Sequence, residues 1–145
     1  MTKVALVTGG TRGIGRAISE RLVKDGFKVA ANYAGNDEAA GKCAEELGLK
    51  CYKWDVGDYD ACADGIAKIT KDLGPVDVLV NNAGITRDML AMRLKDEDWD
   101  AVLDTNLKAV FRMSRAVMRT MMKQRYGRII SITSVVGASG NPGQA

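Results

Sequence analysis

Short apolar runs alternate with longer amphipathic stretches along the whole of this 145-residue chain. Runs such as Val4-Ala5-Leu6-Val7 have the length and composition of buried strands. The stretches between them repeat apolar residues every three or four positions, as Ile18 and Leu22 do, which is typical of helices packed by one face. The pattern predicts, in chain order, strand 3–8, helix 13–25, strand 27–33, helix 37–47, strand 50–54, helix 58–72, strand 76–80, helix 98–124 and strand 128–134.

The punctuation between these segments supports a regular alternation of strands and helices. Gly26, Gly48, Gly74 and Gly127 each follow a helical pattern, where a left-handed C-terminal cap favours glycine. Alternating strands and helices form βαβ units around a parallel sheet. We therefore expect an α/β fold, a Rossmann-type doubly wound parallel sheet with helices on both faces. No repeat, linker or low-complexity stretch divides it, so residues 1–145 are predicted to belong to one domain.

The composition excludes several classes of protein. Hydrophobic residues make up 46% of the chain, but no apolar run reaches the ~20 residues that span a bilayer, and no signal-peptide pattern is present. These features favour a cytoplasmic protein without a membrane partner. Cys43, Cys51 and Cys62 lack Cys-x-x-Cys spacing and predict reduced thiols rather than disulfides. Because there is no histidine, Ser-His-Asp catalysis and histidine-based zinc sites are excluded, and we expect no metal.

The segment Thr8-Gly9-Gly10-Thr11-Arg12-Gly13-Ile14-Gly15 lies where the first predicted strand turns into the first predicted helix. Glycine lets a backbone turn sharply and approach a ligand, and the free N–H groups at a helix start attract anions. A turn that merely uses glycine is the alternative interpretation. The flanking strand and helix favour a site for the phosphates of a nucleotide.

Two motifs resemble the short-chain dehydrogenase/reductase family: the spacing Gly-x-x-x-Gly-x-Gly and the segment Asn81-Asn82-Ala83-Gly84 after strand 76–80. The resemblance implies a nicotinamide dinucleotide bound by Gly9 to Gly15 and by Asn82, Ala83 and Gly84. It also implies that Asp55 hydrogen-bonds the adenine amino group and that Val56 packs on the ring. Asp55 as a turn residue, and the asparagines as hydrogen-bonding groups at the sheet end, remain alternatives.

Arg12 bears on which dinucleotide is bound. A guanidinium in the glycine loop could contact a 2′-phosphate, which would select NADP(H), although a solvated loop arginine is the simpler reading. The second strand ends in Asn32-Tyr33, without the acid that binds a free ribose 2′-hydroxyl. Asp37 follows a few residues later, and the run Asn36-Asp37-Glu38 is more typical of a helix cap followed by first-turn acids.

The same resemblance implies two catalytic residues. Asn106 matches the helical asparagine that holds a water in the proton relay, although a helical asparagine satisfied by backbone is the ordinary interpretation. Ser134 matches the serine that donates a hydrogen bond to the substrate carbonyl, while Ser131 lies deeper in the predicted strand. The family's tyrosine, with lysine four residues later, is absent. We therefore expect the chain to be the front part of such an enzyme, with a fold that is incomplete at its C-terminus.

Further segments resemble two groups of reductases within the family. Asn82 to Asp88 and Gly140 to Ala145 are similar to 3-oxoacyl-[acyl-carrier-protein] reductases, whereas Ala30 to Glu38 is similar to acetoacetyl-CoA reductases of polyhydroxybutyrate synthesis. Both groups reduce a 3-oxoacyl thioester, and the resemblance implies that Asp88 and Gln144 lie near the substrate. Asn141 departs from the acetoacetyl-CoA pattern, so coenzyme A and acyl carrier protein both stay open. A non-catalytic nucleotide-binding module is the alternative function.

The long helix 98–124 carries two contrasting faces. Its basic residues could steer a polyanionic carrier, although a solvated face explains them equally, and nucleic acid is disfavoured because no aromatic residues interleave with them. The apolar face is expected to be core and, by family resemblance, to help form a homotetramer. The basic positions are Lys108, Arg112, Arg115, Arg119 and Lys123, and the apolar ones are Leu103, Leu107, Val110, Val117 and Met121.

Overall fold

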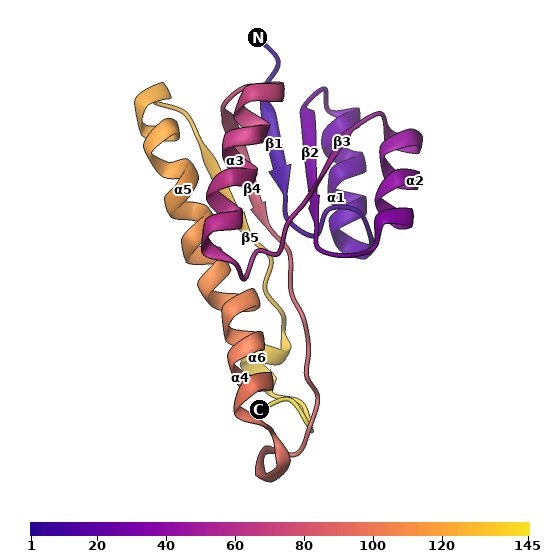
Figure 1. The fold of residues 1–145 in the computed structure, drawn as a ribbon, viewed down its shortest axis with the longest axis vertical. Coiled ribbons are helices and arrows are strands. Elements are labelled where there is room, and N and C mark those ends of the chain that lie inside the picture. The colour runs from indigo at the N-terminus through magenta and orange to yellow at the C-terminus, as the bar shows by residue number, and fades with distance from the viewer.

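The computed structural model describes residues 1–145 and contains one five-stranded parallel sheet with the strand order β3-β2-β1-β4-β5 (Figure 1). This confirms the predicted α/β fold and every predicted strand and helix, with changes at some boundaries. The elements are β1 (Val4–Val7), α1 (Gly13–Lys24), β2 (Lys28–Tyr33), α2 (Asp37–Leu47), β3 (Lys50–Lys53), α3 (Tyr59–Leu73), β4 (Val76–Asn81), the 3-10 turn η1 (Ala91–Arg93), α4 (Asp96–Leu103), the π-helical turn η2 (Asp104–Lys108), α5 (Ala109–Gln124), β5 (Arg128–Ser131) and α6 (Val136–Ser139).

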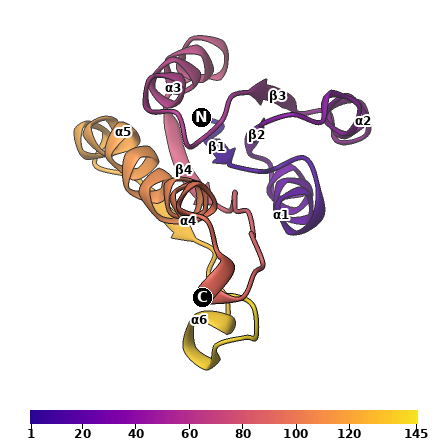
Figure 2. The same ribbon diagram turned by 60° about the horizontal axis from the view of Figure 1, so that its bottom comes forward.

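Helices cover the two faces of the sheet in pairs. Because neighbouring strand residues point to opposite faces, Val4 and Leu6 of β1 join a core cluster with α3 and α5, while Ala5 and Val7 join a second cluster with α1 and α2. Figure 2 shows α3 and α5 on one side of the sheet and α1 and α2 on the other. The chain is thus doubly wound, and strands buried on both faces explain their uninterrupted apolar runs.

The carboxyl ends of the strands point toward the lower part of the molecule in Figure 1. There the chain that follows β4 and the chain that follows β5 extend beyond the sheet beside α4, and α6 lies near the C-terminus (Figures 1 and 2). The chain adds β2 and β3 on one side of β1 and then β4 and β5 on the other side, so the direction in which strands are added reverses between β1 and β4. In open parallel sheets, ligands bind in the crevice at such a switch point, next to the carboxyl ends.

The long helix differs from its prediction in one respect that affects packing. It begins at Asp96 and is interrupted by η2, whose π-helical turn shifts later residues around the axis by about 100°. Leu103 and Leu107, expected in the core, are 37% and 66% exposed, because this part of the helix extends past the sheet. Neither this helix nor any other has the length and apolar composition needed to cross a membrane. The buried residues of α5 are Ala109, Met113, Val117 and Met121.

One cap and one strand boundary near the C-terminal end differ from the prediction. Helix α5 ends at Gln124, as predicted, but its left-handed cap is Arg125, with φ of 54°, rather than Gly127. Gly127 is required for another reason, since a Cβ there would overlap the side chain of Met121. The predicted strand 128–134 ends at Ser131, and after one more backbone hydrogen bond the chain turns into α6.

Strand β5 is an exposed edge of the sheet, and we predict that the polypeptide of residues 1–145 self-associates through it. All its residues are exposed, and it forms a sheet edge with no proline and with Arg128 as its single charged residue. Replacing Ile130, which is 48% exposed, by lysine should reduce the association, whereas Met92→Lys on η1 should leave it unchanged. Sedimentation velocity across a concentration series measures the effect. A monomeric parent polypeptide would contradict the prediction.

Candidate active site

The turn between β1 and α1 is built to accept an anion. Gly9 and Gly13 have φ of 60° and 51°, the left-handed region that side chains disfavour. Helix α1 starts without a side-chain cap and without an acid in its first turn. By contrast, Asn36 caps α2 and Asp58 caps α3, and both helices carry acids at their starts. The first N–H groups of α1 have no partner within the helix and are therefore available to a phosphate.

Two other glycines of the loop are needed for close packing. A Cβ on Gly15 would collide with the Gly9 carbonyl and with Nδ2 of Asn82. Gly10 lies behind the loop, where its carbonyl accepts a hydrogen bond from the buried Ser19 hydroxyl at 2.9 Å. A Cβ on Gly10 would come within 2.9 Å of that hydroxyl. Gly10 thus packs the loop against α1 and, unlike the other glycines, does not line the cavity in front of it.

Hydrogen bonds join the loop to the end of β4. The Thr8 hydroxyl accepts from the backbone N–H groups of Asn82 and Ala83, each at 3.0 Å. In return, Nδ2 of Asn82 donates to the carbonyls of Thr8 at 3.1 Å and Gly9 at 3.2 Å. The side chain of Asn82 is therefore a hydrogen-bonding group at the end of the sheet, which was the alternative interpretation of this residue. Thr8, which was part of the motif but had no assigned role, fixes the distance between the two segments.

Asn32, for which the sequence pattern predicted no role, connects the loop to the neighbouring strand ends. Its side chain is buried within β2, where Oδ1 accepts from the Gly9 N–H at 3.3 Å and Nδ2 donates to the Trp54 carbonyl at 2.9 Å. Trp54 directly precedes Asp55, so one amide sets the loop relative to the segment after β3. An asparagine inside an otherwise apolar strand was the signal that could have revealed it.

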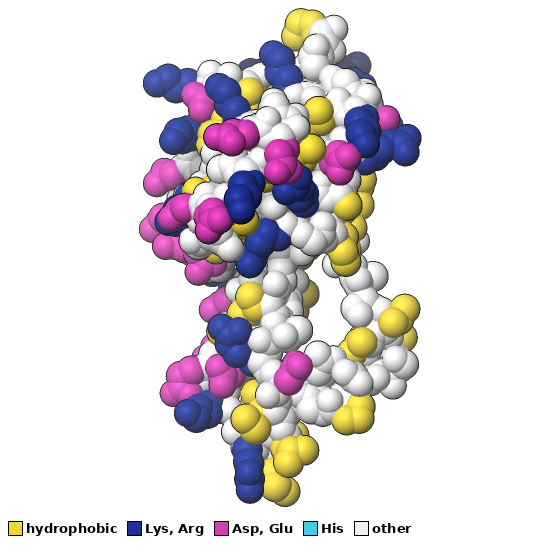
Figure 3. All heavy atoms as spheres, turned by 90° about the vertical axis from the view of Figure 1, so that its right-hand side faces the viewer, with side chains coloured by type: hydrophobic (Ala, Val, Ile, Leu, Met, Phe, Trp, Pro, Cys, Tyr) yellow, Lys and Arg dark blue, Asp and Glu magenta, His cyan; other side chains and the backbone are white.

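A cavity of about 760 Å³ opens in front of the loop, at the carboxyl edge of the sheet. Figure 3 shows the molecule hollowed below the rounded body that carries α1 and α2. The cavity volume is within the usual range for small-molecule sites. The fold brings all the expected cofactor-binding residues except Gly10 to its wall, namely Gly9, Thr11, Arg12, Gly13, Ile14, Gly15, Asp55, Val56, Asn82, Ala83 and Gly84.

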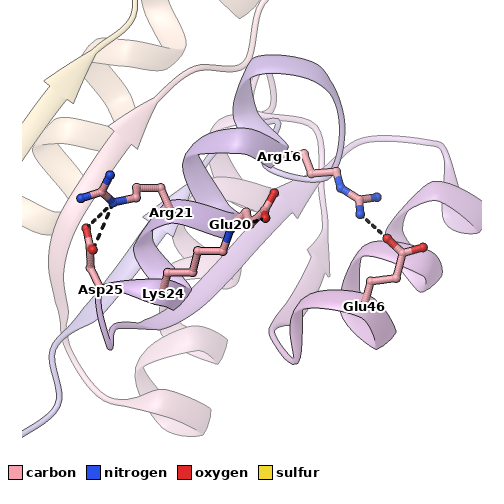
Figure 4. Close-up of polar contacts among 6 residues, drawn as sticks. All are labelled: Arg16, Glu20, Arg21, Lys24, Asp25 and Glu46. Carbon is pink, nitrogen blue, oxygen red and sulfur yellow. Dashed lines mark hydrogen bonds and ion pairs between the residues drawn. The ribbon is translucent and has the colours of Figure 1, made fainter.

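Arg12 is the basic residue of this cavity that forms no ion pair. Arg16, one turn along α1, is paired with Glu46 of α2, as Figure 4 shows beside the other ion pairs of α1. Arg87, which also lines the cavity, is 3.5 Å from a carboxylate oxygen of Asp98. The Arg12 guanidinium is therefore free to meet an anionic ligand.

A second cavity of about 610 Å³ adjoins the first, and the two share Ile85 and Arg87. Asn106 stands at the boundary, in the π-helical turn: its Oδ1 accepts from the Ile85 N–H and its Nδ2 donates to the Ile85 carbonyl, both at 2.8 Å. The side chain is thus satisfied by backbone of another segment rather than of its own helix. π-Helical turns occur frequently at functional sites.

The remaining candidate residues also line the second cavity. Ser134 lies beyond β5 rather than on it, and its Oγ accepts from the Val136 N–H at 3.2 Å, which leaves its hydroxyl proton free to donate. Ser131 lies outside this cavity. Gln144 donates to Oδ1 of Asp88 at 3.0 Å, so the two residues expected near the substrate are hydrogen-bonded to each other in the wall of this cavity. No tyrosine or lysine is among the lining residues.

The chain is similar to known proteins along most or all of its length. A model of the family described as short chain dehydrogenase matches residues 3–145. The acetoacetyl-CoA reductase of Shinella zoogloeoides is 53% identical over 100% of this chain and 60% of its own length, and that of Paracoccus denitrificans is 56% identical over 94% and 57%. The 3-oxoacyl-[acyl-carrier-protein] reductase FabG of Staphylococcus aureus is 50% identical over 100% and 61%. The chain thus spans about 60% of the length of these relatives.

The packing of the glycine loop predicts that Gly15→Ala destabilises the fold. The new methyl group would meet the Gly9 carbonyl and Asn82, which hydrogen bonds hold in place, so the free energy of unfolding should fall by about 1–3 kcal/mol. Gly41, exposed in α2 with open space around it, is the matched control. Gly41→Ala should raise stability by about 0.5–1 kcal/mol through helix propensity. Urea unfolding compares the variants, and equal stability would contradict the packing argument.

Proposed function

The chain belongs to the short-chain dehydrogenase family, and on that basis we propose that it uses NADPH to reduce a 3-oxoacyl thioester to the 3-hydroxyacyl thioester. The observation that carries the proposal is the adjacency of two cavities, one at the glycine loop and one at Ser134, on either side of Ile85. Relatives named as reductases of such thioesters, both coenzyme A and carrier-protein forms, support the reaction type. They do not favour a non-catalytic nucleotide-binding module.

The first cavity fits a dinucleotide phosphate. The free N–H groups of α1 suit the pyrophosphate, and the unpaired Arg12 suits a 2′-phosphate. In our proposal Asp55 and Val56 receive the adenine, and the backbone of Asn82 to Gly84 borders a ribose. The bound nucleotide would supply the hydride. The chain's own contribution is to hold the ligand at the switch point, next to the second cavity.

Ser134 and Asn106 serve different parts of the proposed reaction. The free hydroxyl proton of Ser134 can bond to the substrate carbonyl oxygen, which gains negative charge as hydride arrives. Asn106 fixes Ile85 between the cavities and, with the remaining hydrogen-bonding capacity of its amide, supports the proton relay. Because neither tyrosine nor lysine lines the second cavity, we propose that the proton donor comes from outside residues 1–145.

The carrier of the acyl group is coenzyme A or acyl carrier protein, and both are polyanions. Only part of the predicted basic stripe is available to them. Lys108 pairs with Asp104, Arg112 donates to the Gly57 carbonyl, and Arg115 lies over the Tyr59 ring. Arg128 is engaged as well, since it donates to the Gly127 carbonyl and lies over the Tyr126 ring. The steering surface that we propose therefore consists of the basic residues at the end of α5, namely Arg119, Lys123 and Arg125.

We also propose that the protein works in the cytoplasm as a homotetramer. The support for assembly is a set of exposed apolar side chains along the long helix, because several such residues on one element are typical of an interaction surface, whereas single ones need no explanation. The set is Leu103, Leu107, Phe111, Met118 and Met122. The three cysteines are unpaired, as expected in a reducing compartment.

Replacing Arg12 tests the cofactor proposal. Loss of a charge-assisted contact costs about 1.5–3 kcal/mol, so Arg12→Ala should weaken NADPH binding roughly ten- to a hundredfold and change NADH binding little. Fluorescence titration of both nucleotides measures this. The protein titrated is either the chain itself or a fusion protein, in which the chain is joined to the segment of the Shinella zoogloeoides reductase that it does not match. Arg93→Ala, on the exposed turn η1 and outside both cavities, is the control. Tighter binding of NADH by the parent protein would refute the preference.

Ser134→Ala tests the proposed chemistry. Because the hydroxyl stabilises charge that develops during reduction, kcat of the fusion protein for acetoacetyl-CoA should fall on the order of 10²–10³-fold while NADPH binding persists. The same assay with an acetoacetyl carrier protein compares the two carriers. Ser131→Ala, at the end of β5 and outside the cavity, is the matched control. Equal, mild effects of the two substitutions would show that Ser134 has no such role.

A further inference from the structure

An acidic side chain, that of Asp37, directly follows a residue that lines the nucleotide cavity, Asn36, but does not itself line the cavity. Asp37 is the first residue of α2, directly after the capping residue Asn36, whose side chain accepts from the Ala39 N–H at 2.9 Å. An acid shortly after the second strand is the residue type that binds the ribose 2′-hydroxyl of NAD in folds of this class. In this structure Asp37 does not line the nucleotide cavity.

Two side chains from neighbouring strands hold the Asp37 carboxylate. The Tyr33 hydroxyl donates to Oδ1 at 3.0 Å, and the Lys53 ammonium donates to Oδ2 at 3.1 Å. Tyr33 and Lys53 are register partners on the parallel strands β2 and β3, so the sheet itself sets them side by side. The carboxylate at the start of α2 completes a cluster of three residues.

The phenol ring of Tyr33 separates two spaces. Tyr33 lines the nucleotide cavity and also a groove of about 440 Å³ between α2 and β3, whereas Asp37 lines the groove alone. The neighbouring acid, Glu38, is paired with Lys42 at 2.9 Å. Both negative charges at the start of α2 are therefore compensated on the side away from the cavity.

The ionisation of the cluster is consistent with this arrangement. The hydrogen bonds from Lys53 and then Tyr33 lower the pKa of Asp37, and the nearby Lys53 charge acts in the same direction. Burial, followed by the hydrogen bond to Asp37, raises the pKa of Tyr33, so its hydroxyl stays protonated as a donor. Asp37 is thus an anion at neutral pH, and its position matters electrostatically to any phosphate placed near Arg12.

We propose that the Tyr33–Asp37–Lys53 cluster is a positioning device for cofactor selectivity: it holds an ionised carboxylate outside the nucleotide cavity, so that a 2′-phosphate meets Arg12 without a competing anion. The inference rests on the proposed NADPH preference and deepens it. Released from Lys53, Asp37 could turn toward the cavity, where it would repel the phosphate of NADPH and accept a hydrogen bond from the 2′-hydroxyl of NADH.

The test compares the dissociation constants of NADPH and NADH in a set of variants. Lys53→Met should weaken NADPH binding by about three- to tenfold and strengthen NADH binding, so that the ratio of the two constants shifts toward NADH. Tyr33→Phe, which keeps the ring and removes the donor, should shift the ratio in the same direction. Lys50→Met is the matched control, because Lys50 lines the same groove on β3 without bonding Asp37, and its ratio should stay unchanged.

The double variant Lys53→Met/Asp37→Asn separates the proposal from a direct contact between Lys53 and the phosphate. Removing the released charge should restore NADPH binding to the parental value, whereas a lost lysine–phosphate contact would not be restored and would overturn the proposal. An unchanged ratio in Lys53→Met, with a parent that prefers NADPH, would overturn the cluster's role and leave the proposed function intact. A parent that prefers NADH would overturn both.

Discussion

The close approach of Gly15 to the Gly9 carbonyl is the constraint on which the rest of the site depends. It brings the first turn of α1 directly behind the loop that leaves β1, so the unpaired N–H groups of the helix face the crevice where the strand order reverses. Asn82 fills the remaining space and bonds the same carbonyl. One packed contact therefore fixes the loop, the helix start and the end of β4 relative to one another.

From this contact, hydrogen bonds extend in two directions along the carboxyl edge of the sheet. Asn32 carries the connection outward to the segment after β3, and Asn106 carries it to Ile85 and the second cavity. These asparagines come from a strand and from a π-helical turn. A side-chain amide can donate and accept at once, so each asparagine sets the position of a backbone segment that has no regular structure of its own.

Much of the fold and of the first cavity could be predicted because short-range chemistry determines them. Apolar runs set the strands, Asn36 caps α2, and the glycines mark the loop. Features that depend on long-range packing could not be predicted from the sequence. The π-helical turn and the exposure of Leu107 occur where the long helix extends past the sheet, and β5 ends early at an edge of the sheet. The contact of Lys53 with Asp37 depends on strand register, which no local pattern reveals.

The position of β1 between β2 and β4 also has a consequence for synthesis on the ribosome. The bond from Thr8 to Val80 joins residues 72 positions apart, so the central strand emerges long before one of its partners exists. At about 5–20 residues per second, the nascent chain carries a half-paired central strand for about 4–15 s. Helices α1 to α3 are complete within that interval, and they cover the apolar faces of the strands already made. The order of the elements along the chain therefore lets helices cover the apolar strand faces of the nascent chain before β4 is available to pair with β1.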